Sequence, residues 1–305
     1  MTNYVIKRIA YAFLTIFLIS VLTFSVMNMI PGGPFLSEKA VSPTTLAAMN
    51  VKYGLDKPLP IQFINYMGNL LHGDFGLSIK QMGRSANDII SSTFPVSARL
   101  GGISIFLALV FGIIMGSVAA LNRGKWLDSL LMIISTLGIA VPAFVVATFL
   151  MITFGVKLHW LPTMGLNSPI HYILPVATLM FYPMAYITRL MRSSMLDTLN
   201  QDYIRTARSK GVSKFMTLFK HAMRNAIIPV LTYVGPLLAY TVTGSFVVEK
   251  IFNIPGLGRE FINCITGRDY PMVMGTTIFL AVLLVFMNVI VDICYKLIDP
   301  RIKLK

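Results

Sequence analysis

Six long apolar stretches constrain this chain more than any other feature of its sequence. Each can form a helix that crosses a hydrocarbon core of ~30 Å, which takes roughly 20 residues. They cover residues 9–30, 100–121, 129–154, 172–191, 226–248 and 273–295. Hydrophobic residues make up 55% of the chain and charged residues only 12%, too little charge for a soluble surface. The sequence predicts an all-α polytopic membrane protein with six transmembrane helices.

Positive charge indicates which side of the membrane each connecting segment faces. With the N-terminus inside, the inner segments hold most of the Lys and Arg residues, although together they are much shorter than the outer segments. Cytoplasmic loops carry such an excess, so both termini are predicted to be cytoplasmic. The net charge of +14 is assigned to these loops, and no nucleic-acid partner is expected.

On this topology the chain divides into four parts. Residues 1–30 form a short cytoplasmic tail and the first transmembrane helix, whose apolar stretch is too long for a signal peptide. Residues 31–99 form a mixed extracytoplasmic segment, which is either a small cap or a ligand site. Residues 100–295 form a five-helix core with an inner loop at 192–225, and residues 296–305 form a cytoplasmic tail.

The second apolar stretch carries a small residue at every fourth position. This spacing places all of them on one helical face, where another helix can approach closely. Packing within the chain is the expected use of this face. The five residues are Ser104, Ala108, Gly112, Gly116 and Ala120.

Three residues are candidates for a translocation path. Pro142 and Pro236 interrupt predicted transmembrane helices, and an interior proline kinks a helix and frees a backbone carbonyl. Asp292 is the only acid inside a predicted span. It indicates either a transport pathway or, because Lys296 follows at i+4, an ion pair near the inner boundary. The scarcity of charged residues inside the predicted spans argues against a proton-coupled carrier.

Common catalytic motifs are absent from the sequence. It contains no Walker A sequence, no His-Glu-x-x-His, no Gly-x-Ser-x-Gly and no Cys-x-x-Cys. The four histidines lack the spacing of metal ligands, and Cys264 and Cys294 fall near opposite sides of the membrane. The sequence therefore predicts free thiols, no enzyme, no bound metal and no cofactor in this chain.

The inner loop at 192–225 is long and has the pattern of folded structure. Asn200 or Asp202 can cap a helix that ends at Gly211, and Ser213 can cap a second helix. The apolar residues of the second helix recur at helical spacing and are Phe215, Leu218, Phe219 and Ala222. This pattern leaves two interpretations open: a helix pair lying on the lipid surface, or a docking element for a cytoplasmic partner.

A family resemblance favours docking. The order Ala207, Gly211, Pro229 is similar to the cytoplasmic loop of ABC-importer membrane subunits. The chain has Arg-Thr-Ala where the generic pattern has Glu-Ala-Ala, and its proline follows the glycine at a longer interval than usual; both departures match the peptide/nickel branch. The wider resemblance, to the B-type membrane subunits of bacterial oligopeptide permeases, rests on the segments at 31–35, 72–76, 94–98, 160–162, 244–249, 268–270 and 299–301.

The resemblance implies a type I importer fold and an ATP-driven peptide importer in the bacterial cytoplasmic (inner) membrane. The implied partners are a homologous second permease subunit, two cytoplasmic ATPase subunits that hold ATP and Mg, an extracytoplasmic peptide-binding protein and the lipid bilayer. The loop would supply a coupling helix seated in a cleft of an ATPase subunit. The residues implied in this docking are Asp202, Tyr203, Arg205, Thr206, Ala207, Arg208, Lys210, Gly211 and Phe215.

The alternative function is a stand-alone channel or secondary carrier that uses the basic loop as a membrane-surface anchor. A carrier would be active without ATPase subunits, whereas half of an importer would be inert alone. The sequence leaves the cargo open, because relatives with this layout carry dipeptides, oligopeptides, nickel chelates and some sugars.

Overall fold

The chain forms two compact units. The computed structural model describes residues 2–31, 33–35, 43–242 and 244–298. Among these residues, the first unit combines those up to residue 96 with 255–286, and the second combines 97–254 with 287–298. The two units are defined by which residues pack together in space. The four ranges proposed from the sequence were instead defined by the side of the membrane on which each segment is predicted to lie.

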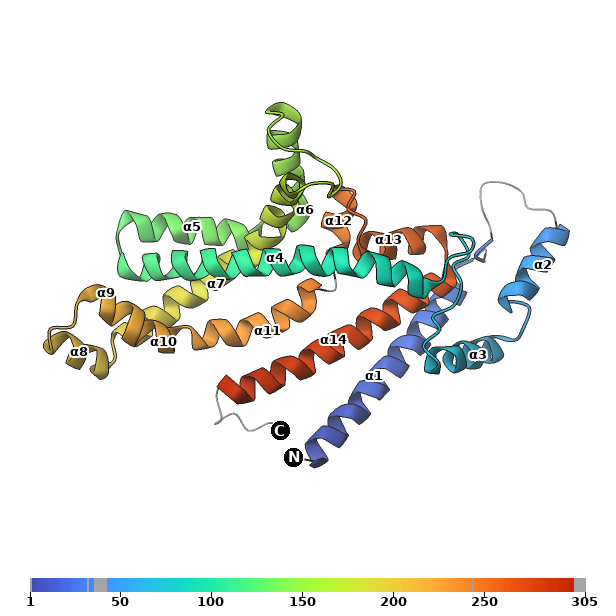
Figure 1. The fold of residues 1–305 in the computed structure, drawn as a ribbon, viewed down its shortest axis with the longest axis horizontal. Coiled ribbons are helices and arrows are strands. Elements are labelled where there is room, and N and C mark those ends of the chain that lie inside the picture. The colour runs from blue at the N-terminus through green and yellow to red at the C-terminus, as the bar shows by residue number, and fades with distance from the viewer. Residues whose placement is uncertain (1, 32, 36–42, 243, 299–305) are drawn as a thin grey trace. The chain divides into compact units, whose positions relative to one another are not determined.

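Most of the described residues are helical, and their one β contact is an isolated bridge between Leu77 and Ser85. Figure 1 shows the helices. In chain order they are α1 (Thr2–Met29), α2 (Pro43–Tyr53), α3 (Leu59–Leu71), α4 (Ala86–Leu121), α5 (Trp126–Ala140), α6 (Ala143–Leu150), the π-helix η1 (Met151–Lys157), the 3-10 helix η2 (Pro169–Tyr172), α7 (Ile173–Leu199), α8 (Asp202–Ser209), α9 (Lys214–Met216), the π-helix η3 (Thr217–Ala222), α10 (Met223–Ala226), α11 (Ile228–Val242), α12 (Phe246–Ile251), α13 (Leu257–Gly267) and α14 (Tyr270–Ile298).

The predicted all-α fold with up to six apolar spans is confirmed. Four helical segments are long and apolar enough to cross a membrane, and two bent helix pairs pass the same test together. The four segments are Ala10–Met29, Ala86–Leu121, Pro169–Leu199 and Tyr270–Val291. The second one begins well before residue 100, because the hydropathy pattern marks only the apolar part of a longer helix.

The third predicted span is not a straight helix. The pair Trp126–Ala140 and Ala143–Lys157 is bent by 108°. Val141 precedes a proline and takes an extended conformation (φ −87°, ψ 123°), and Pro142 does the same (φ −60°, ψ 143°). A residue before proline is disfavoured in the helical region, and proline has no N–H to continue the ladder. Two successive extended residues therefore turn the chain sharply.

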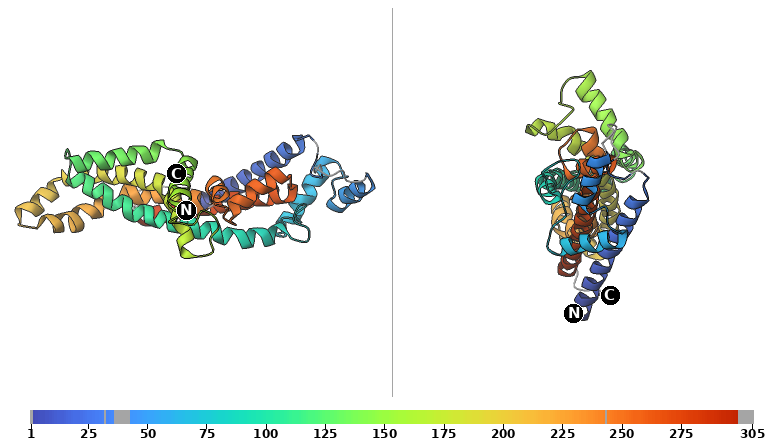
Figure 2. Two further views of the ribbon diagram at one scale, coloured as in Figure 1. Left: turned by 90° about the horizontal axis from the view of Figure 1, so that it is seen from above. Right: turned by 90° about the vertical axis from the view of Figure 1, so that its right-hand side faces the viewer.

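In the second unit, α7 packs against α4, α5 and α11 (Figures 1 and 2). The small residues of α4 allow this packing. All five of the predicted small residues are buried. A side chain added at Gly112 would place its Cβ 2.7 Å from Ile187 Cγ2, and one at Gly116 would lie 2.6 Å from the Thr188 carbonyl oxygen. The α4 backbone therefore lies directly against α7.

In the first unit, a buried carboxylate joins two distant segments. Asp269, 3% exposed, accepts hydrogen bonds from the backbone N–H groups of Ile79 (3.0 Å) and Lys80 (3.2 Å) and from the Ser78 hydroxyl. It also accepts from the N–H of Met272 at 3.4 Å, in the first turn of α14. One side chain thus caps a helix and fixes the loop at 78–80, so its charge is fully hydrogen-bonded.

The burial of Cys264 in the first unit can be tested by chemical modification of its thiol. Cys264 is 5% exposed and is a free thiol, as expected. Burial, with smaller contributions from Asp269 and Glu260, raises the pKa of the Cys264 thiol to about 12. Only the thiolate is nucleophilic, so this group stays protonated and unreactive at neutral and mildly alkaline pH.

We therefore expect iodoacetamide to leave Cys264 unmodified at pH 8 and to modify it once urea exposes it, as measured by peptide mass spectrometry. Because the thiol pKa of the folded state lies above that of the unfolded state, stability falls as pH rises past the unfolded value. Rapid alkylation of the folded protein at pH 8 would contradict the burial.

Candidate functional site

The predicted inner loop is folded and turns on a glycine. Helix α8 ends in two backbone hydrogen bonds, from the N–H of Gly211 to the Arg208 carbonyl (3.0 Å) and from the N–H of Val212 to the Ala207 carbonyl (3.2 Å). This pair of bonds is the Schellman arrangement, which needs a left-handed residue after the helix. Gly211 supplies it with φ of +77°. The predicted turn at Gly211 is therefore present.

The start of α8 differs from the expectation. The residue before the first turn is Gln201, and its side chain makes no capping bond; neither Asn200 nor Asp202 is the cap. Asp202 lies instead within the first turn and Arg208 within the last, so each charge opposes the helix dipole favourably. Asp202 and Arg205 form an exposed ion pair at 3.7 Å.

Helix α8 has one buried face and one exposed face. Ile204 is fully buried and belongs to the same core as Met195 of α7 and Leu218 and Ala222 of η3. Ala207 is also buried, so its small side chain allows α8 to approach the rest of the chain and is not part of the exposed surface. The residues of α8 and its turn that are exposed are Asp202, Tyr203, Arg205, Thr206, Arg208, Ser209, Lys210 and Gly211.

The second loop helix is present but is wound differently from the prediction. Ser213 caps it, since the N–H of Met216 donates to the Ser213 hydroxyl at 3.3 Å. Residues 217–222 then form a π-helix, which changes the residue period. As a result only Leu218 and Ala222 of the predicted apolar face are buried. Phe215 and Phe219 are exposed, with ring centroids 4.4 Å apart.

The loop therefore presents cations and an aromatic pair to its surroundings while its inner side is part of the protein core. Figures 1 and 2 show α8 and α9 at one end of the second unit. Tyr203 links α8 to α10 through its hydroxyl, which accepts a hydrogen bond from Asn225 Nδ2 at 2.8 Å. A force on α8 can reach α7 and α11 directly, because all three share one core.

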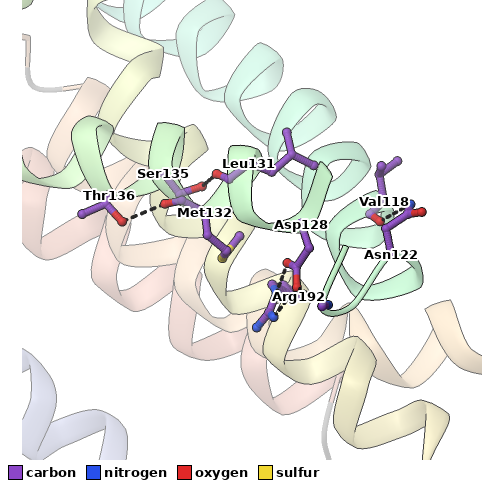
Figure 3. A network of polar contacts seen from close by, with 9 residues as sticks. Val118, Asn122, Asp128, Leu131, Met132, Ser135, Thr136 and Arg192 are labelled. Carbon is purple, nitrogen blue, oxygen red and sulfur yellow. Dashed lines mark hydrogen bonds and ion pairs between the residues drawn. The ribbon is translucent and has the colours of Figure 1, made fainter. Parts of the chain in front are cut away.

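A partly buried ion pair lies farther along α7. Arg192 donates from Nε to Asp128 Oδ1 at 2.6 Å and from Nη2 to Asp128 Oδ2 at 2.7 Å (Figure 3). The N–H of Gly124 donates to Asp128 Oδ2 at 3.0 Å. The bidentate pair thus ties the turn between α4 and α5 to α7. One turn along α7, Arg189 donates to the hydroxyl of Thr136.

Sequence reasoning missed this pair. The hydropathy pattern places Asp128 in a short cationic loop just before a span, but α5 begins at Trp126 and Asp128 is buried in its first turn. Its partner, Arg192, is far away along the chain, on another helix. The one available signal is that Asp128 is the single acid among residues 122–128.

The predicted path residues lie on three different helical segments. Pro142 is exposed at the break between α5 and α6, and Pro236 is exposed within α11. Asp292 lies in α14, but its side chain lies outside the described part of the structure. Among the described residues, no three His, Cys, Asp or Glu side chains are placed to hold a metal ion.

Comparisons with known proteins cover the whole chain. A family model described as "binding-protein-dependent transport system inner membrane component" matches residues 108–304, and the model of its N-terminal component matches residues 1–101. The dipeptide transport system permease protein DppB of Bacillus subtilis is 47% identical over 304 residues, covering 100% of this chain and 99% of the relative. The oligopeptide transport system permease protein OppB of Haemophilus influenzae is 42% identical over 305 residues, covering 99% and 100%.

Solved structures share the fold at low sequence identity. An inward-facing structure of the MetNI methionine ABC transporter has a TM-score of 0.56 and 14% identity, covering 69% of this chain and 96% of that one. An amino acid ABC transporter crystallised with histidines has a TM-score of 0.51 and 19% identity, covering 69% and 94%. The expected type I importer fold is confirmed by these likenesses.

Proposed function

Because this chain belongs to the family of binding-protein-dependent transport system inner membrane components, we propose that it forms half of the membrane path of an ATP-driven peptide importer. The names of its full-length relatives, which are dipeptide and oligopeptide permeases, support the cargo class. The second half would come from a homologous permease subunit, and an extracytoplasmic binding protein would deliver the peptide. Membrane insertion follows from the apolar spans, and the charge distribution supports cytoplasmic termini.

Helix α8 is the proposed point at which an ATPase subunit docks. The observation that carries this is its two-sided construction: Ile204 and Ala207 are buried, while Arg205, Arg208 and Lys210 are exposed. The exposed cations offer charge-assisted hydrogen bonds to acids of a partner, and Phe215 offers apolar contact. ATP and Mg would be bound by the partner, not by this chain.

In the proposed cycle, closure of the ATPase subunits on ATP pushes α8. Since Ile204 shares a core with α7 and η3, the push moves those helices together rather than bending the loop. The paired spans then change between outward and inward access. This chain performs no bond chemistry in the cycle; it transmits a displacement.

Uptake by the purified assembly tests the function. The complex would be isolated through a tag on this chain and reconstituted in liposomes with its binding protein. We expect ATP-dependent accumulation of labelled peptides from a length series, and no uptake by this chain alone. Uptake by the isolated chain without ATPase subunits would contradict the proposal and favour the carrier.

A substitution at the loop turn tests the coupling role. Gly211 has φ of +77°, but the space around a Cβ at this position is open, so any penalty comes from the backbone alone. A left-handed conformation costs a branched or bulky residue about 1–2 kcal/mol. We expect Gly211→Leu to lower ATP-driven uptake roughly tenfold at unchanged membrane insertion.

Gly211→Asn is the matched control, because asparagine tolerates the left-handed region. It should keep most of the uptake. Equal, wild-type uptake by both variants would show that the geometry of this turn is not used in coupling.

A further inference from the structure

Three tyrosines gather on one surface of the second unit. Tyr186 of α7 and Tyr233 of α11 stack with ring centroids 4.2 Å apart and an interplanar angle of 26°. Tyr182 lies one helical turn before Tyr186 and so is on the same face of α7. Tyr182 and Tyr186 are exposed, 46% and 38%. We call these three residues the tyrosine surface.

The tyrosine surface lies within the predicted membrane span, away from its ends. Tyr182 is at the midpoint of the predicted span at 172–191, and Tyr186 lies one helical turn closer to its inner end. Tyr233 lies at the same depth because its ring stacks on Tyr186. Tyrosine is normally enriched at the two membrane interfaces, where its hydroxyl reaches water. Three tyrosines inside the predicted spans, away from both interfaces, therefore need another explanation.

Hydrogen bonding argues against a surface that faces lipid. Among the described residues, none of the three hydroxyls donates to or accepts from another residue within hydrogen-bond distance. A hydroxyl without a partner in hydrocarbon is costly, and lipid tails offer none. The partners must therefore come from water or from another molecule with polar groups.

Close helix packing with a second subunit fits this surface poorly. Helices that pack tightly in membranes meet through small residues, as α4 does against α7 through Gly112 and Gly116. Large exposed rings keep a neighbouring helix at a distance and leave space between them. A passing solute that carries both amides and apolar groups fits that space.

We propose that Tyr182, Tyr186 and Tyr233 line the translocation path and contact the peptide as it crosses. This inference rests on the proposed function and deepens it. The hydroxyls would exchange hydrogen bonds with main-chain amides, which every peptide carries, and the rings would pack against its apolar side chains. Because all three residues are uncharged, the contact accepts peptides of varied sequence and disfavours bare inorganic ions.

Labelling of introduced cysteines tests whether the surface faces water. Tyr186→Cys and Tyr233→Cys would be made in the intact transporter after both native cysteines are replaced by alanine. A charged methanethiosulfonate reagent reacts with thiolates, which form only in water. The matched control is Phe106→Cys, since Phe106 is an exposed residue of α4 within its span, 64% exposed, with an apolar ring.

We expect both tyrosine positions to be labelled and Phe106→Cys to stay unlabelled. A saturating peptide should slow the labelling of Tyr186→Cys severalfold. If both tyrosine positions resist the reagent, or if peptide does not change their labelling rate, the path assignment is wrong. Resistance that disappears when the second permease subunit is omitted would assign the surface to the subunit interface instead.

Conservative variants provide an independent measurement. Tyr186→Phe and Tyr233→Phe keep the rings and remove the hydroxyls, so folding should be preserved. The loss of one hydrogen bond should raise the KM for peptide uptake about two- to tenfold. An unchanged KM in both variants would overturn the proposed contact. Failure of the wild-type complex to import any peptide would reject the proposed function itself, while the labelling pattern would still report whether the surface is wet.

Discussion

Asp128→Ala is expected to destabilise the folded chain by about 3 kcal/mol and to stop ATP-driven uptake. The substitution leaves the partly buried Arg192 guanidinium without its anion, and breaking a fully buried pair costs about 3–5 kcal/mol. The Asp128 side chain is 6% exposed and that of Arg192 is 27% exposed, so the lower end of this range applies. Both hydrogen bonds of the pair are short, at 2.6 and 2.7 Å.

The expected loss of transport follows from what the pair connects. It joins the turn between α4 and α5 to α7, whose C-terminal end leads into α8 (Figure 3). Without it, a displacement of α8 would reach the α4–α5 turn only through helix packing and the Arg189–Thr136 hydrogen bond. The measurements are the thermal inactivation midpoint of the solubilised complex and peptide uptake in liposomes.

Asn122→Ala is the matched control for this experiment. Asn122 lies in the same turn, and its amide donates to the Val118 carbonyl one helical turn earlier, at 2.9 Å. That bond stays at the end of α4 and does not reach α7, so its removal should change neither measurement by much. If Asp128→Ala behaves like Asn122→Ala, the pair is not a structural link.

Gly116→Ala is the second substitution that is expected to destabilise the folded chain strongly. The new methyl group would lie 2.6 Å from both the Met191 Cβ and the Thr188 carbonyl oxygen, and 3.1 Å from the Arg192 nitrogen. Two of these are backbone atoms of α7, so no rotamer change relieves the overlap and the helices must separate. Overpacking of a filled core costs about 1–3 kcal/mol, and we expect the upper value.

A glycine-to-alanine substitution elsewhere on α4, Gly102→Ala, is the control. Gly102 lies in α4, and a Cβ there would meet no atom within 4 Å. Because alanine is the better helix former, Gly102→Ala should be neutral or stabilising by up to about 1 kcal/mol. The assay is the yield of monodisperse complex and its thermal midpoint. Equal yields and midpoints for Gly116→Ala and Gly102→Ala would show that α4 and α7 are not in close contact.

The apolar spans could be predicted from the sequence because a single property, hydropathy over about 20 residues, decides them. The turn of the inner loop could be predicted for a similar reason, since Gly211 and Ser213 act locally. The bend at Pro142 was only partly foreseen. A proline predicts a kink, but the 108° angle depends on both Val141 and Pro142 being extended and on the contacts of α5 and α6 with α7.

Features that depend on residues far apart in the chain were not predictable. The winding of residues 217–222 as a π-helix breaks the helical period on which the predicted apolar face relied. The Asp128–Arg192 pair and the stacking of Tyr186 on Tyr233 join different helices, and neither leaves a periodic pattern. Such contacts can be found only once the helices are placed in space.

The break at Pro142 also bears on how the chain enters the membrane during synthesis. Helix α5 has 15 residues and is about 22 Å long, shorter than the ~30 Å hydrocarbon core. The second half of the pair, α6 with η1, does not exceed α5 in length, and its axis is bent from that of α5 by 108°. Neither half can be inserted stably as an independent membrane segment. Both halves contact α7, so a nascent chain that ends before residue 173 should stay only loosely inserted until α7 leaves the ribosome.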